Sequence, residues 1–294
     1  AIPLVITSLG IAIAFKMQFW NIGGEGQIAI GSFAASYFAL YMNDMPMPLM
    51  LTVMILAGML AGGLWALIPA FFKAQWGTNE TIVTLMMNYI ALKWVMFLQY
   101  GPWRDPKSLG FPKIANFPQN AVLPKLLGVH VGWVIALILV VVVYIFINHT
   151  KKGYEIAVIG ESINTARYAG INIKKTILIA IMLSGGLCGL VGMIQASAVN
   201  YTLSVEITGG VGYTAIITAW LAALSAPLIL IVSILFAALL EGGSYIQTVF
   251  GIPQAAAEIL QGIILFFVLG SEFFVRYKFV IVKKHSAIAE KGAD

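Results

Sequence analysis

Residues 149–175, HTKKGYEIAVIGESINTARYAGINIKK, decide how the rest of the chain is arranged. This is the one long polar stretch, compatible with a helix, between two blocks of nearly continuous apolar sequence. Its cations are Lys151, Lys152, Arg167, Lys174 and Lys175. A segment with this charge cannot lie in lipid, and basic loops of membrane proteins stay on the cytoplasmic side. We therefore interpret residues 148–175 as a cytoplasmic loop on which a soluble partner docks.

The composition around this loop is that of a membrane protein. Of the 294 residues, 60% are hydrophobic and only 10% are charged, and the mean hydropathy is +0.93. A soluble domain carries about 25% charged residues. The apolar runs are long and unbroken, whereas the strands of a membrane barrel alternate over about 10 residues. The sequence therefore predicts an all-α integral membrane protein, a polytopic helical bundle in contact with the lipid bilayer. The net charge of +5 resides in loops, so it indicates topology and not nucleic-acid binding.

The candidate membrane spans are residues 2–15, 26–43, 48–72, 81–99, 131–147, 176–198, 212–225, 227–247 and 255–270. A full crossing needs about 20 residues, so the shorter segments are expected to be tilted, broken or re-entrant. With the 148–175 loop inside, the tail 271–294 is also inside. The proline- and aromatic-rich segment 100–130 is then outside and is expected to form an ordered cap.

Two pieces of sequence recur in the same order. GGEGQIAI at 23–30 resembles GGVGYTAI at 209–216, and PLMLTVMIL from Pro48 resembles PLILIVSIL from Pro227. By this topology the two copies run in opposite directions, as in transporters with inverted repeats. We expect one transmembrane domain, 1–294, with an incomplete first repeat at 1–99 and a second at 131–270. One helix before residue 1 would complete a five-plus-five arrangement.

Polar residues in or beside the apolar segments are candidates for a solute pathway. Asn21, Glu25 and Gln27 lie in NIGGEGQ, which either lines a cavity as irregular backbone or is a loop between two spans. Asn88 lies inside an apolar run, where an amide serves function or joins helices. The full candidate set is Asn21, Glu25, Gln27, Asn79, Glu80, Asn88, Gln195, Glu258 and Gln261. Asn79 can also cap the next helix with Glu80 in its first turn, and Glu258 either faces a cavity or partner or lies at the membrane interface. The tryptophans are interpreted as packing and membrane-interface residues.

The central loop contains signals for a short helix. Ser162 can cap its start, and Gly170 fits its C-terminal stop, which leaves about two turns, INTARYA. Such a helix inserts into a groove of a soluble protein or lies on lipid headgroups. Ala166 and Ala169 are small and are expected to allow close approach to the partner. Ala166→Glu is therefore expected to uncouple the loop from that partner. The predicted coupling residues are Gly160, Glu161, Ser162, Asn164, Ala166, Arg167, Ala169 and Gly170.

The sequence lacks the motifs of an enzyme. No Gly-Lys dipeptide occurs, so there is no GxxxxGK[ST] phosphate-binding loop. The three histidines and one cysteine have no metal-site spacing, and no nucleophile–base set is present. We expect no cofactor or metal in this chain and no ATP hydrolysis by it.

At three of these motifs the chain resembles a known family. NIGGEGQ at 21–27, GESINTARYAGI at 160–171 and GYTAIITAWLA at 212–222 are similar to the permease subunits of bacterial ABC importers for branched-chain amino acids, simple sugars and nucleosides. TNETIVTLMMNYIAL at 78–92 and YGPWRDP at 100–106 look most like the nucleoside-type permeases. The resemblance covers essentially the whole chain. One departure is WLAAL at 220–224, where many sugar permeases carry a Leu-Gly pair.

The resemblance implies the other parts of an importer. A separate ABC ATPase subunit, which holds ATP and Mg, would dock on the loop. A second, related permease chain would share the pathway, and an extracytoplasmic solute-binding lipoprotein would deliver the solute. The expected location is the bacterial cytoplasmic membrane and the expected cargo is a nucleoside. A sugar such as ribose, or branched-chain amino acids, are alternative cargoes. A secondary transporter driven by ions also fits an inverted repeat, and an intramembrane enzyme lacks its catalytic residues.

Overall fold

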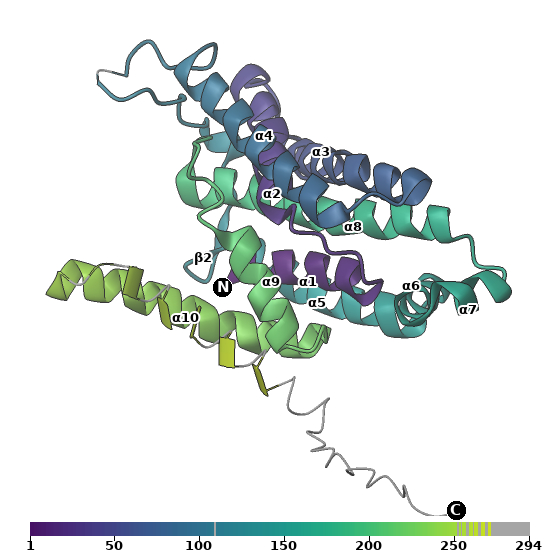
Figure 1. The fold of residues 1–294 in the computed structure, drawn as a ribbon. Helices are drawn as coiled ribbons and strands as arrows, with labels where there is room; N and C mark the ends of the chain where they lie inside the picture. Colours follow the sequence, from purple (N-terminus) through teal and green to yellow (C-terminus); the bar gives the residue numbers. More distant parts are fainter. Residues whose placement is uncertain are drawn as a thin grey trace, which may run out of the picture.

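The computed structural model describes residues 1–271 except 109, 252, 254, 257, 258, 261, 264, 265, 268 and 269. In chain order the elements are α1 (Ile2–Lys16), α2 (Gly24–Tyr41), α3 (Met47–Trp76), α4 (Glu80–Tyr100), η1 (Gln119–Ala121), β1 (Lys125–Leu126), β2 (Val129–His130), α5 (Gly132–His149), α6 (Lys151–Glu161), α7 (Ile163–Tyr168), α8 (Ile173–Ile194), η2 (Gln195–Asn200), α9 (Val211–Leu221) and α10 (Ala226–Phe250) (Figure 1). The predicted span 255–270 is described only in part. Glu258, Gln261 and residues 272–294 of the predicted tail lie outside the described residues.

The prediction of a helical membrane protein is confirmed. Within the part of the chain that the structure describes, five helices are long and apolar enough to cross a membrane: α3, α4, α5, α8 together with η2, and α10. Two further apolar helices, α1 and α9, are shorter. They have 15 and 11 residues, less than the length of a full crossing.

Two helices form the centre of the bundle. Every residue of α1 from Leu4 to Phe15 is buried, and so is every residue of α8 from Ser184 to Ile194. In α3, α4, α5 and α10 only 28% of the most apolar stretch is buried. Large apolar side chains such as Leu56, Leu64 and Ile138 point outward from these outer helices. The outer helices therefore present apolar faces to lipid or to another membrane subunit.

Glycine lets three helices meet backbone to backbone. A Cβ atom built on Gly189 of α8 would lie 2.1 Å from the carbonyl oxygen of Gly58 in α3. A Cβ on Gly31 of α2 would lie 2.4 Å from the Cα of Gly189. No side chain fits at either distance. Small residues at such contacts are how helices pack closely in lipid, where the hydrophobic effect does not drive them together. This glycine contact of α2, α3 and α8 fixes their spacing.

The segment between α4 and α5 is folded and tied to its neighbours. The Asn120 side-chain amide donates to the carbonyl oxygens of Asn43 and Met45, both at 2.9 Å. The Thr202 hydroxyl donates to the Ile114 carbonyl at 2.9 Å, and β1 pairs with β2 as a short hairpin. The predicted order of this segment is thereby confirmed. Figure 1 shows it at the opposite end of the bundle from α7, with α8 running between the two ends.

Candidate functional site

The starts of α2 and α9 lie against each other inside the bundle. α9 follows Gly209 and Gly210, both with positive φ, and α2 follows the link 17–23. A Cβ on Gly24 would lie 3.3 Å from the Cα of Gly212. The two similar glycine motifs therefore touch, although the five-plus-five repeat itself stays a prediction. Helix starts leave backbone N–H groups without partners, and buried ones need acceptors from elsewhere.

Side chains from other helices supply those acceptors. The Glu25 carboxylate of α2 accepts from the backbone N–H of Gly212 at 2.9 Å, at the start of α9. Thr208 and the Tyr213 backbone also interact with this carboxylate. The Asn88 side chain of α4 accepts from the N–H of Gly26 at 2.8 Å, at the start of α2. A carboxylate is favoured at the positive end of a helix. Each helix start is thus closed by a side chain of a different element.

Asn21 and Gln27 complete this buried polar cluster. The Asn21 amide donates to the Gln27 carbonyl oxygen at 3.2 Å, and the Gln27 amide donates back to Asn21 at 3.0 Å. Asn21 also donates to the Ser184 hydroxyl at 3.2 Å. The Asn88 amide donates to the Ile22 carbonyl at 2.9 Å.

Four predicted pathway residues, Asn21, Glu25, Gln27 and Asn88, are therefore brought together. They are at most 2% exposed, and their partners lie within the chain. Their hydrogen bonds hold the two helix starts in place, and their role in a solute pathway stays a prediction. The contacts of Asn88 fit the interpretation that its amide joins helices.

Other predicted pathway residues lie elsewhere. Asn79 is exposed and caps α4 by accepting from the N–H of Thr81 at 3.0 Å. Glu80 forms an ion pair with Lys73 at 2.7 Å across the turn between α3 and α4. Gln195 is half-buried at the start of η2, a π-helical turn that continues α8. These residues are separate from the buried cluster. No sequence motif marked Lys73 as the ion-pair partner of Glu80.

Between α5 and α8, residues 150–172 contain two helices, α6 and α7, while both ends of the predicted loop 148–175 belong to α5 and α8. The predicted cap and stop of the short helix are confirmed: the Ser162 hydroxyl accepts from the N–H of Thr165 at 3.2 Å, and Gly170 has φ +72°. The stretch is compatible with a helix, as its sequence indicates, but the sequence motifs predicted only the short helix and not α6. The missed signal was Thr150, whose hydroxyl accepts from the N–H of Gly153 at 3.1 Å.

An ionised carboxylate ties α6 to α8. Glu155 accepts from the Lys152 ammonium at 2.5 Å and from the Thr176 hydroxyl of α8 at 2.9 Å. The hydrogen bond from Lys152, supported by that from Thr176, holds the pKa of the Glu155 carboxyl below its usual range. The side chain is buried, so these bonds are shielded from water.

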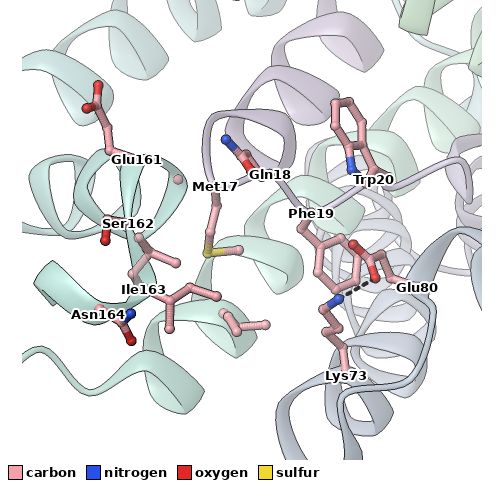
Figure 2. Close-up of a pocket in the computed structure, with 13 residues that line it drawn as sticks. Met17, Gln18, Phe19, Trp20, Lys73, Glu80, Glu161, Ser162, Ile163 and Asn164 are labelled. Carbon is pink, nitrogen blue, oxygen red and sulfur yellow. Dashed lines mark hydrogen bonds and ion pairs between the residues drawn. The ribbon is translucent and has the colours of Figure 1, made fainter. Parts of the chain in front are cut away.

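The end of α6 rests directly on the end of α1. A Cβ on Gly160 would lie 2.0 Å from the carbonyl oxygen of Lys16. Beside this contact is a cavity of about 440 Å³. Figure 2 shows its walls: Met17–Trp20 from the link after α1, the Lys73–Glu80 ion pair, and the segment from Glu161 to Asn164. The helix that carries α7 at its end, α6, is therefore in direct contact with the end of α1.

The exposed side of α7 differs from the predicted one. Ala166 is 0% exposed, so its methyl group packs within the chain and is not offered to a partner. The reason is that the chain folds back after α7, with the N–H of Ile171 bonded to the carbonyl of Ala166 at 3.0 Å. Tyr168 is 93% and Ile163 54% exposed. We define the α7 surface as Ile163, Asn164, Arg167, Tyr168 and Ala169, all of which are exposed.

Comparison with known proteins identifies the chain. Residues 1–269 match the family of the permease component of branched-chain amino acid transport systems. The chain belongs to this permease family. A glucose ABC transporter permease of Haloferax volcanii, TsgB13, is 32% identical over 95% of this chain and 76% of its own length.

Two bacterial relatives are similar over nearly the whole chain. The guanosine permease NupP of Bacillus subtilis is 29% identical over 97% of this chain and 83% of its own length. The nucleoside permease NupB of Lactococcus lactis is 29% identical over 99% of this chain and 83% of its own length. No solved structure matches the permease significantly. The permease is therefore a multi-pass subunit of an ABC transporter in the cytoplasmic membrane.

Proposed function

We propose that the permease imports a nucleoside, driven by ATP that separate ATPase subunits hydrolyse. The choice of a nucleoside rests on the similarity to NupP and NupB, each over 83% of the relative's length. The motifs at 78–92 and 100–106 that resemble nucleoside-type permeases support the same choice. In this proposal the chain contributes pathway and coupling, and no catalytic residue.

The α7 surface supports the proposed ATPase contact. A two-turn helix with an exposed aromatic ring, an exposed aliphatic side chain and a cation, Arg167, has the composition of an interface centre. The end of the bundle that carries α6 and α7 is then the cytoplasmic end, as the excess of lysines in 148–175 indicates.

The remaining partners follow from the same proposal. The apolar outer helices, buried only over 28% of their most apolar stretch, give a second permease chain a surface on which to complete the pathway. The folded segment between α4 and α5 lies at the end away from α7, where an extracytoplasmic binding protein would deliver the solute (Figure 1).

A sugar is the second candidate cargo. TsgB13, a glucose permease by name, is 32% identical over 95% of this chain. Proteoliposomes that contain the permease together with a cognate ATPase, second permease and binding protein distinguish the two cargoes. We expect uptake of radiolabelled guanosine or another nucleoside, and no competition from excess glucose or ribose. Uptake of glucose without uptake of any nucleoside would replace the first candidate by the second.

A further inference from the structure

Three aromatic rings gather where α1 and α9 end. Phe15 is in the last turn of α1, Trp20 is in the link that follows, and Trp220 is in the last turn of α9. The indoles of Trp20 and Trp220 are stacked, with centroids 5.6 Å apart and planes inclined by 13°. Phe15 meets Trp20 edge-on at 5.1 Å. The three rings form one aromatic cluster. It is separate from the polar cluster at the starts of α2 and α9.

This cluster faces a second cavity, of about 650 Å³. Phe15, Trp20 and Trp220 line it together with the polar residues Lys16, Gln18 and Glu161. Its volume lies within the range of about 300–1,000 Å³ that is usual for small-molecule sites. Trp20 is 38% exposed and also lines the first cavity, at whose edge Figure 2 shows its ring.

The chemistry of this cavity suits a flat ring with polar groups at its edge. Indole faces bind nucleobases by stacking, irrespective of which base it is, because every base has a π-face. Lys16 and Gln18 donate hydrogen bonds, and Gln18 and Glu161 accept them, as the edge of a base and the hydroxyls of its sugar require. A hexose lacks the aromatic face and can offer only C–H groups to the indoles.

We propose that the planar heteroaromatic ring of the solute stacks on the outer face of the Trp20–Trp220 pair, on the side of the second cavity, as the solute leaves toward the cytoplasm. This inference rests on the proposed nucleoside import and adds the residues that recognise the base. Gly160 of α6 rests on the carbonyl of Lys16 and also lines this cavity. The stacking site therefore adjoins the helices on which the ATPase is proposed to dock. A shift of α6 and α7 therefore changes the floor of the stacking site.

The test is equilibrium binding of radiolabelled guanosine to the purified complex of the permease, the second permease and the ATPase in lipid nanodiscs, without the binding protein. Trp20→Ala and Trp220→Ala are each expected to weaken guanosine binding about tenfold or more, because stacking on an aromatic ring is lost. Trp20→Phe and Trp220→Phe are expected to restore most of the affinity. Excess ribose or glucose is expected not to displace guanosine.

A matched control is Trp94→Ala. Trp94 is 43% exposed, similar to Trp20, but its ring packs on Phe33 in another aromatic cluster, at 5.9 Å. Guanosine binding should be unchanged in this variant. Equal affinity of wild type, Trp20→Ala and Trp220→Ala would overturn the stacking site, and so would equal weakening by Trp94→Ala.

Failure of the stacking site and failure of nucleoside import give different results. Nucleoside uptake by the complete wild-type system, with unchanged guanosine binding in both alanine variants, overturns the stacking site alone. Glucose uptake with no nucleoside uptake overturns the proposed cargo and the stacking site with it. Elution of each variant as an intact complex in size-exclusion chromatography, and recovery of binding in the phenylalanine variants, separate loss of the ring from loss of the fold.

Discussion

Gly189→Leu is expected to prevent assembly of the permease. Already the first carbon of the new side chain would lie 2.1 Å from the Gly58 carbonyl and within 3.0 Å of the Gly62 Cα. These are backbone atoms of α3 that cannot turn away, so α8 must move off α3 and α2. Overpacking of a close helix contact costs roughly 3 kcal/mol or more, a large part of the stability of a folded protein. The measurement is the yield of monodisperse permease in size-exclusion chromatography after extraction in mild detergent.

The control carries the same substitution where space is open. Gly242 lies in α10, and a Cβ there meets no atom within 4 Å. Gly242→Leu changes helix propensity and apolar surface as Gly189→Leu does, but it adds no clash. We expect a yield close to wild type. Monodisperse Gly189→Leu permease in normal yield would mean that the spacing of α2, α3 and α8 is not the one described.

The double variant Arg167→Glu with Tyr168→Ala is expected to uncouple transport from ATP hydrolysis. Tyr168 is 93% exposed, so its removal leaves no cavity in the permease, and both changed residues lie on the α7 surface. Loss of an aromatic anchor and reversal of a charge at the centre of an interface cost about 2–4 kcal/mol, which weakens ATPase binding about 30-fold or more. The measurements are co-purification of the ATPase and solute-stimulated ATP hydrolysis in proteoliposomes.

Two further variants separate docking from folding of the loop. Tyr154→Ala removes a ring that is 66% exposed on α6, outside the α7 surface, and should leave ATPase binding unchanged. Ala166→Glu places a carboxylate at a position that is 0% exposed, so it should disturb the packing of α7 within the chain and not the interface directly. Full coupling in the Arg167→Glu, Tyr168→Ala double variant, with the ATPase still bound, would show that α7 is not the contact.

Local signals in the sequence predicted several elements well. Apolar runs predicted the membrane helices because the bilayer leaves a backbone few alternatives to a helix. Asn79 and Ser162 marked helix starts because a cap requires a side-chain acceptor just before the helix, and this is legible in a few residues. Positive-φ Gly170 after α7 follows the same local logic.

The sequence did not predict which distant segments contact each other. Ala166 looked like a surface residue because its burial depends on how α7 packs against α6 and α8. Asn21, Glu25 and Asn88 looked like pathway residues because their hydrogen-bond partners at Ser184, Gly212 and Gly26 depend on how the helices meet. Trp20 and Trp220 were interpreted separately as packing residues, since 200 positions separate residues that stack in the fold.

We infer that this chain is the permease of an importer driven by ATP. The most direct test is solute uptake into proteoliposomes that contain the permease with its ATPase, second permease and binding protein, with ATP enclosed and no ion gradient. We predict that uptake requires hydrolysable ATP and persists when ionophores collapse sodium and proton gradients. Uptake that follows an imposed sodium or proton gradient, and proceeds without ATP, would contradict the account and identify an ion-coupled secondary transporter.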